Sequence, residues 1–127
     1  MTQGTATARR ILVVEDELEI ADVERNILTA EGFAVDIARD GVEALERLAA
    51  TRYHGIVLDA NLPGVDGYEV ASRLRGLPLN RTTPIVMVTA SLEPDARQRG
   101  FELGISGFIA KPFNPGTFRA LISSLAQ

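Results

Sequence analysis

The chain has 127 residues, of which 46% are hydrophobic, and this is the size of one ordinary domain that buries its own core. It contains no cysteine, which excludes disulfides and thiolate metal sites, and its formal net charge of −4 argues against a surface that binds nucleic-acid phosphates. No apolar stretch is long enough to span a bilayer.

These bulk properties predict one domain at residues 10–127 and a disordered tail at residues 1–9, which lack the apolar core of a signal peptide. The absence of cysteine is compatible with a reducing compartment, so the cytoplasm is the expected location. Neither a nucleic acid nor a membrane is expected as a direct partner. Met1 and the lack of a linker or output domain favour a stand-alone protein over a module cut from a larger one.

Strand-like and helix-like patterns alternate through the first half of the domain. A continuous apolar run at 11–14 predicts a strand, and residues 33–38 alternate like a half-buried strand. Between them, apolar residues at helical spacing predict a helix that closes at Gly32, with the inward stripe Ile20, Val23, Ile27 and Ala30. After the turn at Asp40-Gly41, a second helix is expected, with the stripe Val42, Leu45 and Leu48.

The second half continues the alternation. Apolar runs predict strands at 55–58, 84–88 and 107–110, with a loop at 62–64 and a break at 76–80. A short third helix is expected to turn Tyr68, Ala71 and Leu74 inward, and a fourth runs from Pro94 to Gly104. The inward residues of the fifth helix are predicted to be Phe118, Leu121, Ile122 and Leu125.

This order of elements predicts a (βα)₅ fold of the α/β class. Parallel strands with right-handed crossovers form a doubly wound, three-layer sandwich. Fully apolar runs at the first, third and fourth strands indicate the centre of the sheet, and the polar second strand fits an edge. The order 2-1-3-4-5, which is flavodoxin-like, satisfies both conditions.

Residues able to handle a phosphoryl group follow four of the five apolar runs. Glu15-Asp16, Asp59, Thr89 and Lys111-Pro112 stand at these strand ends, and an open α/β sheet places its ligands at that edge. Two like charges about 4 Å apart repel by roughly 4 kcal/mol at an effective dielectric of about 20. The three carboxylates therefore predict a bound hard cation, for which Mg²⁺ fits best.

Each of these residues also has a structural interpretation. Asp16 with Glu19 could form only a helix capping box, and Asp59 could cap a turn. Thr89 is a common strand residue and Lys111 could be a solvated amine, but their joint placement favours a functional site. His54, the only histidine, is expected at the surface, so histidine catalysis and an ordinary zinc site are not expected.

The four segments at the strand ends together resemble the receiver domain of two-component response regulators. Residues 11–17 resemble its acidic-pair motif, 56–67 its phosphoacceptor loop, 84–90 its threonine strand and 111–113 its lysine loop. The resemblance implies that Asp59 accepts a phosphoryl group from a sensor histidine kinase or phosphotransfer protein. It also implies that Thr89 and Lys111 bind phosphoryl oxygens, and that the peptide bond before Pro112 is cis.

By the same resemblance, the Mg²⁺ ligands are Asp16 and Asp59 through side chains, Asn61 through its carbonyl oxygen and Glu15 through water. Phe108 stands at the position of the switch aromatic and turns inward as Thr89 moves. The resulting change affects the surface of the fourth helix, fifth strand and fifth helix, which regulates a downstream protein. The expected state is a monomer or weak dimer, acting as a phosphoacceptor that assists its own phosphorylation and dephosphorylation rather than as an enzyme.

The chain departs from the family pattern at few positions. Glu15 replaces a commoner aspartate, and Phe108 lacks the hydroxyl of the frequent tyrosine.

Gly100 lies inside the fourth helix, where glycine costs about 1 kcal/mol relative to alanine. This predicts a soft helix, with close packing of Gly100 against a neighbour as the alternative.

Three other functions remain open at this point. A haloacid-dehalogenase-type phosphohydrolase also uses a strand-end aspartate, but it needs a general acid where this chain has Asn61. FMN binding is disfavoured because Glu15-Asp16-Glu17 would repel a phosphate. A receiver-like module that is never phosphorylated would lack one of the key residues, and none is missing.

Overall fold

The apolar runs form one parallel sheet in the computed structural model, which describes residues 9–90 and 94–125. Its strands are β1 (Arg10–Val14), β2 (Ala34–Ala38), β3 (Gly55–Asp59), β4 (Ile85–Thr89) and β5 (Gly107–Ala110). They lie in the order β2-β1-β3-β4-β5, which confirms the predicted topology. The predicted tail lies, apart from Arg9, outside the described residues.

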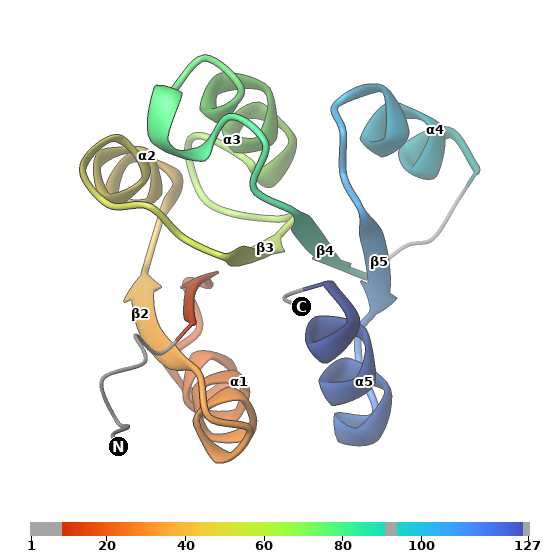
Figure 1. Ribbon diagram of the computed structural model, residues 1–127. Coiled ribbons are helices and arrows are strands. Elements are labelled where there is room, and N and C mark those ends of the chain that lie inside the picture. The colour runs from red at the N-terminus through yellow and green to blue at the C-terminus, as the bar shows by residue number, and fades with distance from the viewer. Residues whose placement is uncertain (1–8, 91–93, 126–127) are drawn as a thin grey trace.

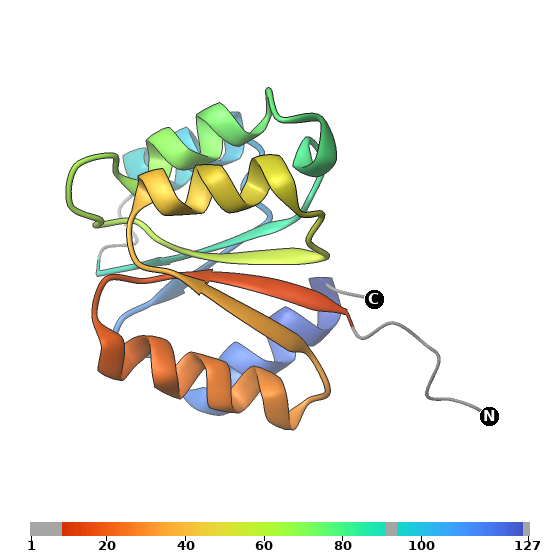
Figure 2. The same cartoon turned by 90° about the vertical axis from the view of Figure 1, so that its left-hand side faces the viewer.

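Helices cover both faces of the sheet. They are α1 (Leu18–Ala30), α2 (Gly41–Ala50), α3 (Gly67–Leu74), α4 (Pro94–Glu102) and α5 (Pro115–Leu125), with a short 3₁₀ helix η1 (Pro78–Asn80) before β4. α1 and α5 lie on one face, and α2, α3 and α4 lie on the other (Figure 1, Figure 2). The structure is therefore the expected three-layer sandwich. None of the helices in the described ranges is long and apolar enough to cross a membrane.

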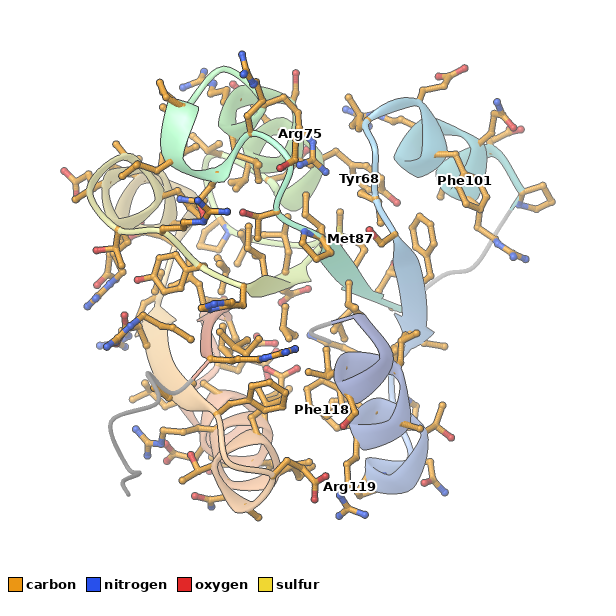
Figure 3. The ribbon with its side chains drawn as sticks, viewed as in Figure 1. Tyr68, Arg75, Met87, Phe101, Phe118 and Arg119 are labelled. Atoms are coloured by element: carbon orange, nitrogen blue, oxygen red, sulfur yellow. The ribbon has the colours of Figure 1, made fainter. Side chains whose placement is uncertain are left out.

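The two halves of the core alternate along each strand, because successive side chains point to opposite faces. Leu12 and Val14 pack beneath α2 and α3, whereas Ile11 and Val13 pack above α1 and α5. Phe118 of α5 is fully buried and stacks on Phe113, with 5.1 Å between ring centroids (Figure 3). Burying one such side chain contributes about 1.5–3 kcal/mol.

The predicted inward faces of α1 and α2 are partly wrong. Val23 and Val42 are 47% and 58% exposed. The buried residues are Ala21, Glu24 and Leu28 in α1, and Gly41, Ala44 and Leu48 in α2. Both helices are thus rotated relative to the prediction, and Ala30 of α1 is exposed as well. Hydrophobic spacing alone does not reveal this rotation.

The other predicted helix faces agree better with the structure. Ala71 and Leu74 of α3 are buried and Tyr68 is half-buried. In α5, Ile122 is buried and Leu121 half-buried, whereas the side chain of Leu125 lies outside the described part. α4 begins at Pro94 as expected.

Candidate functional site

Three carboxylates meet at the carboxyl edge of the sheet. β1 pairs with β3 through Val14 and Leu58, so Glu15 and Asp59 stand at neighbouring strand ends. One oxygen each of Glu15, Asp16 and Asp59 lies within 4.8 Å of the others. Glu15 is 1% exposed and Asp59 is 2% exposed. The topology thus brings these acids together as the sequence predicts.

Lys111 is the cation of this cluster. It follows β5, and its Nζ lies 3.1 Å from Asp59 Oδ2 and 3.3 Å from Glu15 Oε1. Its backbone N–H donates to the Thr89 carbonyl at 2.8 Å, and the following bond to Pro112 is cis. Lys111 is therefore not the solvated amine of the structural interpretation.

The capping alternatives have different outcomes. The N-cap residue of α1 is Glu17, and its side chain makes no capping hydrogen bond, so a capping box centred on Asp16 is wrong. Asp59 does cap the turn after its strand, because the Asn61 N–H donates to Asp59 Oδ1 at 3.0 Å. That hydrogen bond also places the backbone of Asn61 beside the acidic cluster.

Thr89 and Phe108 come from the two strands on the other side of β3. Thr89 ends β4, one residue beyond the partner of Asp59, and is 5% exposed. Phe108 of β5 pairs with Met87 and is half-buried beneath α4. Thr89 thus stands at the strand end next to that of Asp59, and Phe108 lies against α4. His54 is exposed at the amino end of the sheet, where its Nδ1 accepts from the Arg10 N–H, as expected for a surface residue.

The charges at the site are poorly balanced. The pKa of Glu15 is raised to about 7, chiefly by burial and then by the neighbouring Asp59, against the opposing effects of the Glu17 N–H and Lys111. Burial lowers the pKa of Lys111, but its hydrogen bond to Asp59 and the two carboxylate charges outweigh this and raise that pKa above its usual value. The cluster therefore favours additional positive charge.

A hard divalent cation fits these residues. Glu15 Oε1 is buried and, within the part of the chain that is described, its only recorded polar contact is the ion pair with Lys111 at 3.3 Å. Every side-chain ligand that the cluster offers is a carboxylate oxygen, the type that Mg²⁺ prefers. One lysine cannot neutralise three carboxylates. The donor set therefore fits a hard divalent cation such as Mg²⁺.

The sequence analysis did not identify Glu24 as part of this region. Glu24 of α1 is 1% exposed, and neither carboxylate oxygen has a hydrogen-bond partner among the described residues. Its pKa is raised to about 8, chiefly by burial and then by the charge of Glu15, against an opposing effect of Lys111. The one available signal was a glutamate three residues after Ala21 and four before Leu28, on the face that proved to be buried.

A polar groove opens beside the acidic cluster and was also not predicted. It has a volume of about 590 Å³ and is lined by Asp16, Ala60, Asn61, Leu62, Pro63, Asp66, Tyr68 and Arg99. The Arg99 guanidinium lies over the Tyr68 ring at 4.6 Å from its centroid. No sequence pattern pairs these two residues, because they come from different helices.

Comparison with known proteins agrees with this arrangement. A family model described as the response regulator receiver domain matches residues 11–123. The transcriptional regulatory protein ResD of Bacillus subtilis is 42% identical over 106 residues, which cover 84% of this chain and 43% of that protein. The chain spans about half the length of the curated relatives it matches.

Solved structures show the same fold. The chemotaxis response regulator CheY4 of Vibrio cholerae has a TM-score of 0.88 and 32% identity, over 94% of this chain and 99% of that one. The receiver domain of the sensor histidine kinase PA1611 from Pseudomonas aeruginosa, with a magnesium ion coordinated in its active site cleft, has a TM-score of 0.85 and 28% identity, over 94% and 98%. The chain belongs to the response regulator receiver domain family of two-component systems.

Proposed function

We propose that residues 10–127 form a phosphorylation-dependent switch in which Asp59 accepts a phosphoryl group from a phosphohistidine. The observation that carries this proposal is the contact of Asp59 with Lys111 at 3.1 Å, inside a group of three carboxylates within 4.8 Å of one another. Receiver domains are phosphoacceptor signalling modules that interact with histidine kinases and downstream effectors. The proposed donor is a sensor histidine kinase or phosphotransfer protein.

In the proposed reaction, an Asp59 carboxylate oxygen forms a bond to phosphorus while the bond from phosphorus to the histidine nitrogen breaks. The imidazole keeps the electron pair and later takes a proton from solvent. Attack by water on the same phosphorus reverses the modification, giving inorganic phosphate and the free Asp59 carboxylate. Such transfers depend mainly on positioning and charge neutralisation. Lys111 and Thr89 are proposed to bind the phosphoryl oxygens.

Receiver domains bind Mg²⁺ at this acidic site. Asp16, Asp59 and the Asn61 carbonyl would hold it here, with Glu15 acting through water. When bound, it supplies positive charge that neutralises the carboxylates and the phosphoryl oxygens. Lys111 then remains free to follow the phosphoryl group, because its interactions with the acids are no longer needed to balance their charge.

The modified state adds negative charge and strong acceptor oxygens at the strand edge. In our proposal Thr89 moves toward them and Phe108 turns inward, which changes the surface formed by α4, β5 and α5. A downstream protein recognises the altered surface. The switch acts in the cytoplasm as a monomer or weak dimer.

The test is incubation with acetyl phosphate, with and without Mg²⁺, followed by intact-mass measurement. Wild type should gain one phosphoryl group only when Mg²⁺ is present, and Asp59→Asn should gain none. A matched control is Asp22→Asn, which removes an exposed acid that pairs only locally with Arg25. It should be modified like wild type.

Two results would contradict the proposal. An unmodified wild type would favour an interaction module that is never phosphorylated. Many turnovers of phosphate release from small phosphoesters would instead favour a hydrolase of the haloacid dehalogenase type.

A further inference from the structure

The polar groove beside the acidic cluster has one cationic side chain among the described residues that line it. This side chain is Arg99 of α4, and the acids of the same groove are Asp16 and Asp66. Asp16 belongs to the three-carboxylate group, so the groove adjoins the place where Asp59 would be modified. Its volume of about 590 Å³ is in the range of small-molecule sites. The groove therefore offers a small molecule a route to Asp59.

Arg99 is held by an aromatic ring rather than by an acid. Its guanidinium carbon lies over the Tyr68 ring at 4.6 Å from the centroid, and the Tyr68 hydroxyl donates to the Ala96 carbonyl at 3.5 Å. Figure 3 shows Tyr68 between α3 and α4. Within residues 9–90 and 94–125, no ion pair involves Arg99. A guanidinium stacked on a ring still directs its N–H donors outward from its edge, where they can meet an anion.

The two acids of the groove have other interactions that offset their charge. Asp66 is the N-cap residue of α3, and its Oδ1 accepts from the Glu69 N–H at 2.9 Å. The positive end of the helix dipole favours a carboxylate at that position. Asp16 offers an oxygen to the proposed cation site. The positive charge of Arg99 therefore remains the main charge along the wall of the groove.

The direction of phosphoryl transfer decides which part of a donor would meet Arg99. In an in-line displacement the leaving group lies opposite the attacking oxygen of Asp59, and it points outward because Asp59 is buried. With an acyl phosphate, the bond from Asp59 to phosphorus forms and the bond from phosphorus to the acyl oxygen breaks. The electron pair stays on that oxygen, so the leaving group is a carboxylate anion.

A cation beside the leaving group does not help all donors equally. A guanidinium stabilises the negative charge that develops on a departing carboxylate. A phosphohistidine instead loses its phosphoryl group to leave an imidazole, which carries no such charge. Arg99 should therefore favour acyl phosphates over donors with a phosphorus–nitrogen bond.

We propose that Arg99 binds the leaving group of a small acyl phosphate during transfer to Asp59, and that acyl phosphates are thereby a class of donor for this protein. The inference rests on the proposed function, since it concerns the donor for Asp59. It adds a residue of α4 to the groups that decide which donor reacts.

The experiment compares two small donors whose leaving groups differ in charge. Acetyl phosphate leaves as acetate, whereas phosphoramidate, whose nitrogen is protonated at neutral pH, leaves as neutral ammonia. The rate of labelling of the full chain is measured by intact mass with Mg²⁺ present. Arg99→Gln should lower the rate with acetyl phosphate by about fivefold, the upper range for an exposed charge, and should not lower the rate with phosphoramidate. The ratio of the two rates is the readout, because a general disturbance of the site would lower both.

Arg97→Gln is the matched control. Arg97 is exposed on the same helix, and it is not among the residues that line the groove. The substitution removes the same charge from α4, so it tests whether the overall charge of the helix is responsible. The ratio of rates in Arg97→Gln should equal that of wild type.

An unchanged ratio in Arg99→Gln, or an equal fall of the ratio in Arg97→Gln, overturns the proposal. If Arg99→Gln does not fold, Arg99→Met, which keeps the stem without its charge, is measured in the same way and judged by the same ratio. A wild type that both donors label, with an unchanged ratio in the variant, contradicts this inference alone. A wild type that neither donor labels contradicts the proposed function as well.

Discussion

Buried polar side chains at the two ends of the sheet differ in how fully they are hydrogen-bonded. At the amino end, the fully buried Asn80 donates to the Leu48 and Thr51 carbonyls at 2.6 and 2.7 Å and accepts from the Tyr53 N–H at 2.8 Å. At the carboxyl end, Glu15 is almost equally buried, yet its Oε1 has only the ion pair with Lys111 at 3.3 Å, a cation that it shares with Asp59.

This difference distinguishes a structural polar network from the candidate functional site. A buried polar group without a partner costs about 1–3 kcal/mol, whereas one with partners costs little or stabilises the fold. The Asn80 network joins α2 and the segments before β3 and β4, and thus contributes stability. The acidic cluster holds three carboxylates against the one charge of Lys111, so a further cation or a proton should stabilise it.

The largest expected effect is the pH dependence of the free energy of unfolding that comes from Glu24, a buried acid whose pKa Glu15 helps to raise. Unfolded Glu24 loses its proton near pH 4.5, and in the fold its pKa is about 8. Between these values the unfolded chain binds fewer protons, so the free energy of unfolding falls as pH rises. The loss attributable to Glu24 is on the order of 5 kcal/mol.

Urea unfolding of wild type and Glu24→Gln from pH 4 to pH 9 measures this loss. The free energy of unfolding of the variant should fall less steeply with pH. Glu46→Gln, which changes an exposed glutamate of α2, is the control and should follow wild type. Parallel profiles for wild type and Glu24→Gln would show that Glu24 does not hold a proton in the folded protein.

The next largest loss of stability should come from Asn80→Ala at the amino end of the sheet, where the buried polar groups are hydrogen-bonded. It leaves two carbonyls and the Tyr53 N–H without their partner, which we expect to cost about 3–4 kcal/mol of stability. The exposed Asn26→Ala in α1 should change stability by less than about 0.5 kcal/mol. Denaturant unfolding measures both. Equal small losses in the two variants would contradict a structural role of the network.

A smaller change in stability should follow from binding of Mg²⁺ at the acidic cluster. Mg²⁺ at about 100 times its dissociation constant should stabilise the folded chain by about 2.7 kcal/mol. Asp16→Asn should abolish most of this gain, whereas Asp22→Asn should retain it. Thermal unfolding with and without Mg²⁺ is the measurement, and equal gains in both variants would place the cation elsewhere.

Strand-end chemistry was predictable because it depends only on topology. Once the apolar runs were identified as parallel strands in the order 2-1-3-4-5, Glu15, Asp59 and Lys111 had to reach one edge. The network around Asn80 was not predictable, since three of its hydrogen bonds join backbone groups of Leu48, Thr51 and Tyr53, which are distant in the chain. The pairing of Arg99 with Tyr68 was not predictable either, because these two side chains come from different helices.

The sequence by itself determined the alternation of strands and helices, the order of the sheet and the residues at its carboxyl edge, because these follow from short-range hydrophobic pattern and from chain direction. Only the tertiary structure decided how each helix is rotated against the sheet. That rotation exposes Val23, buries Glu24 and seats Phe108 against Gly100. Its physical cause is close packing between layers, which depends on the shapes of residues far apart in the chain.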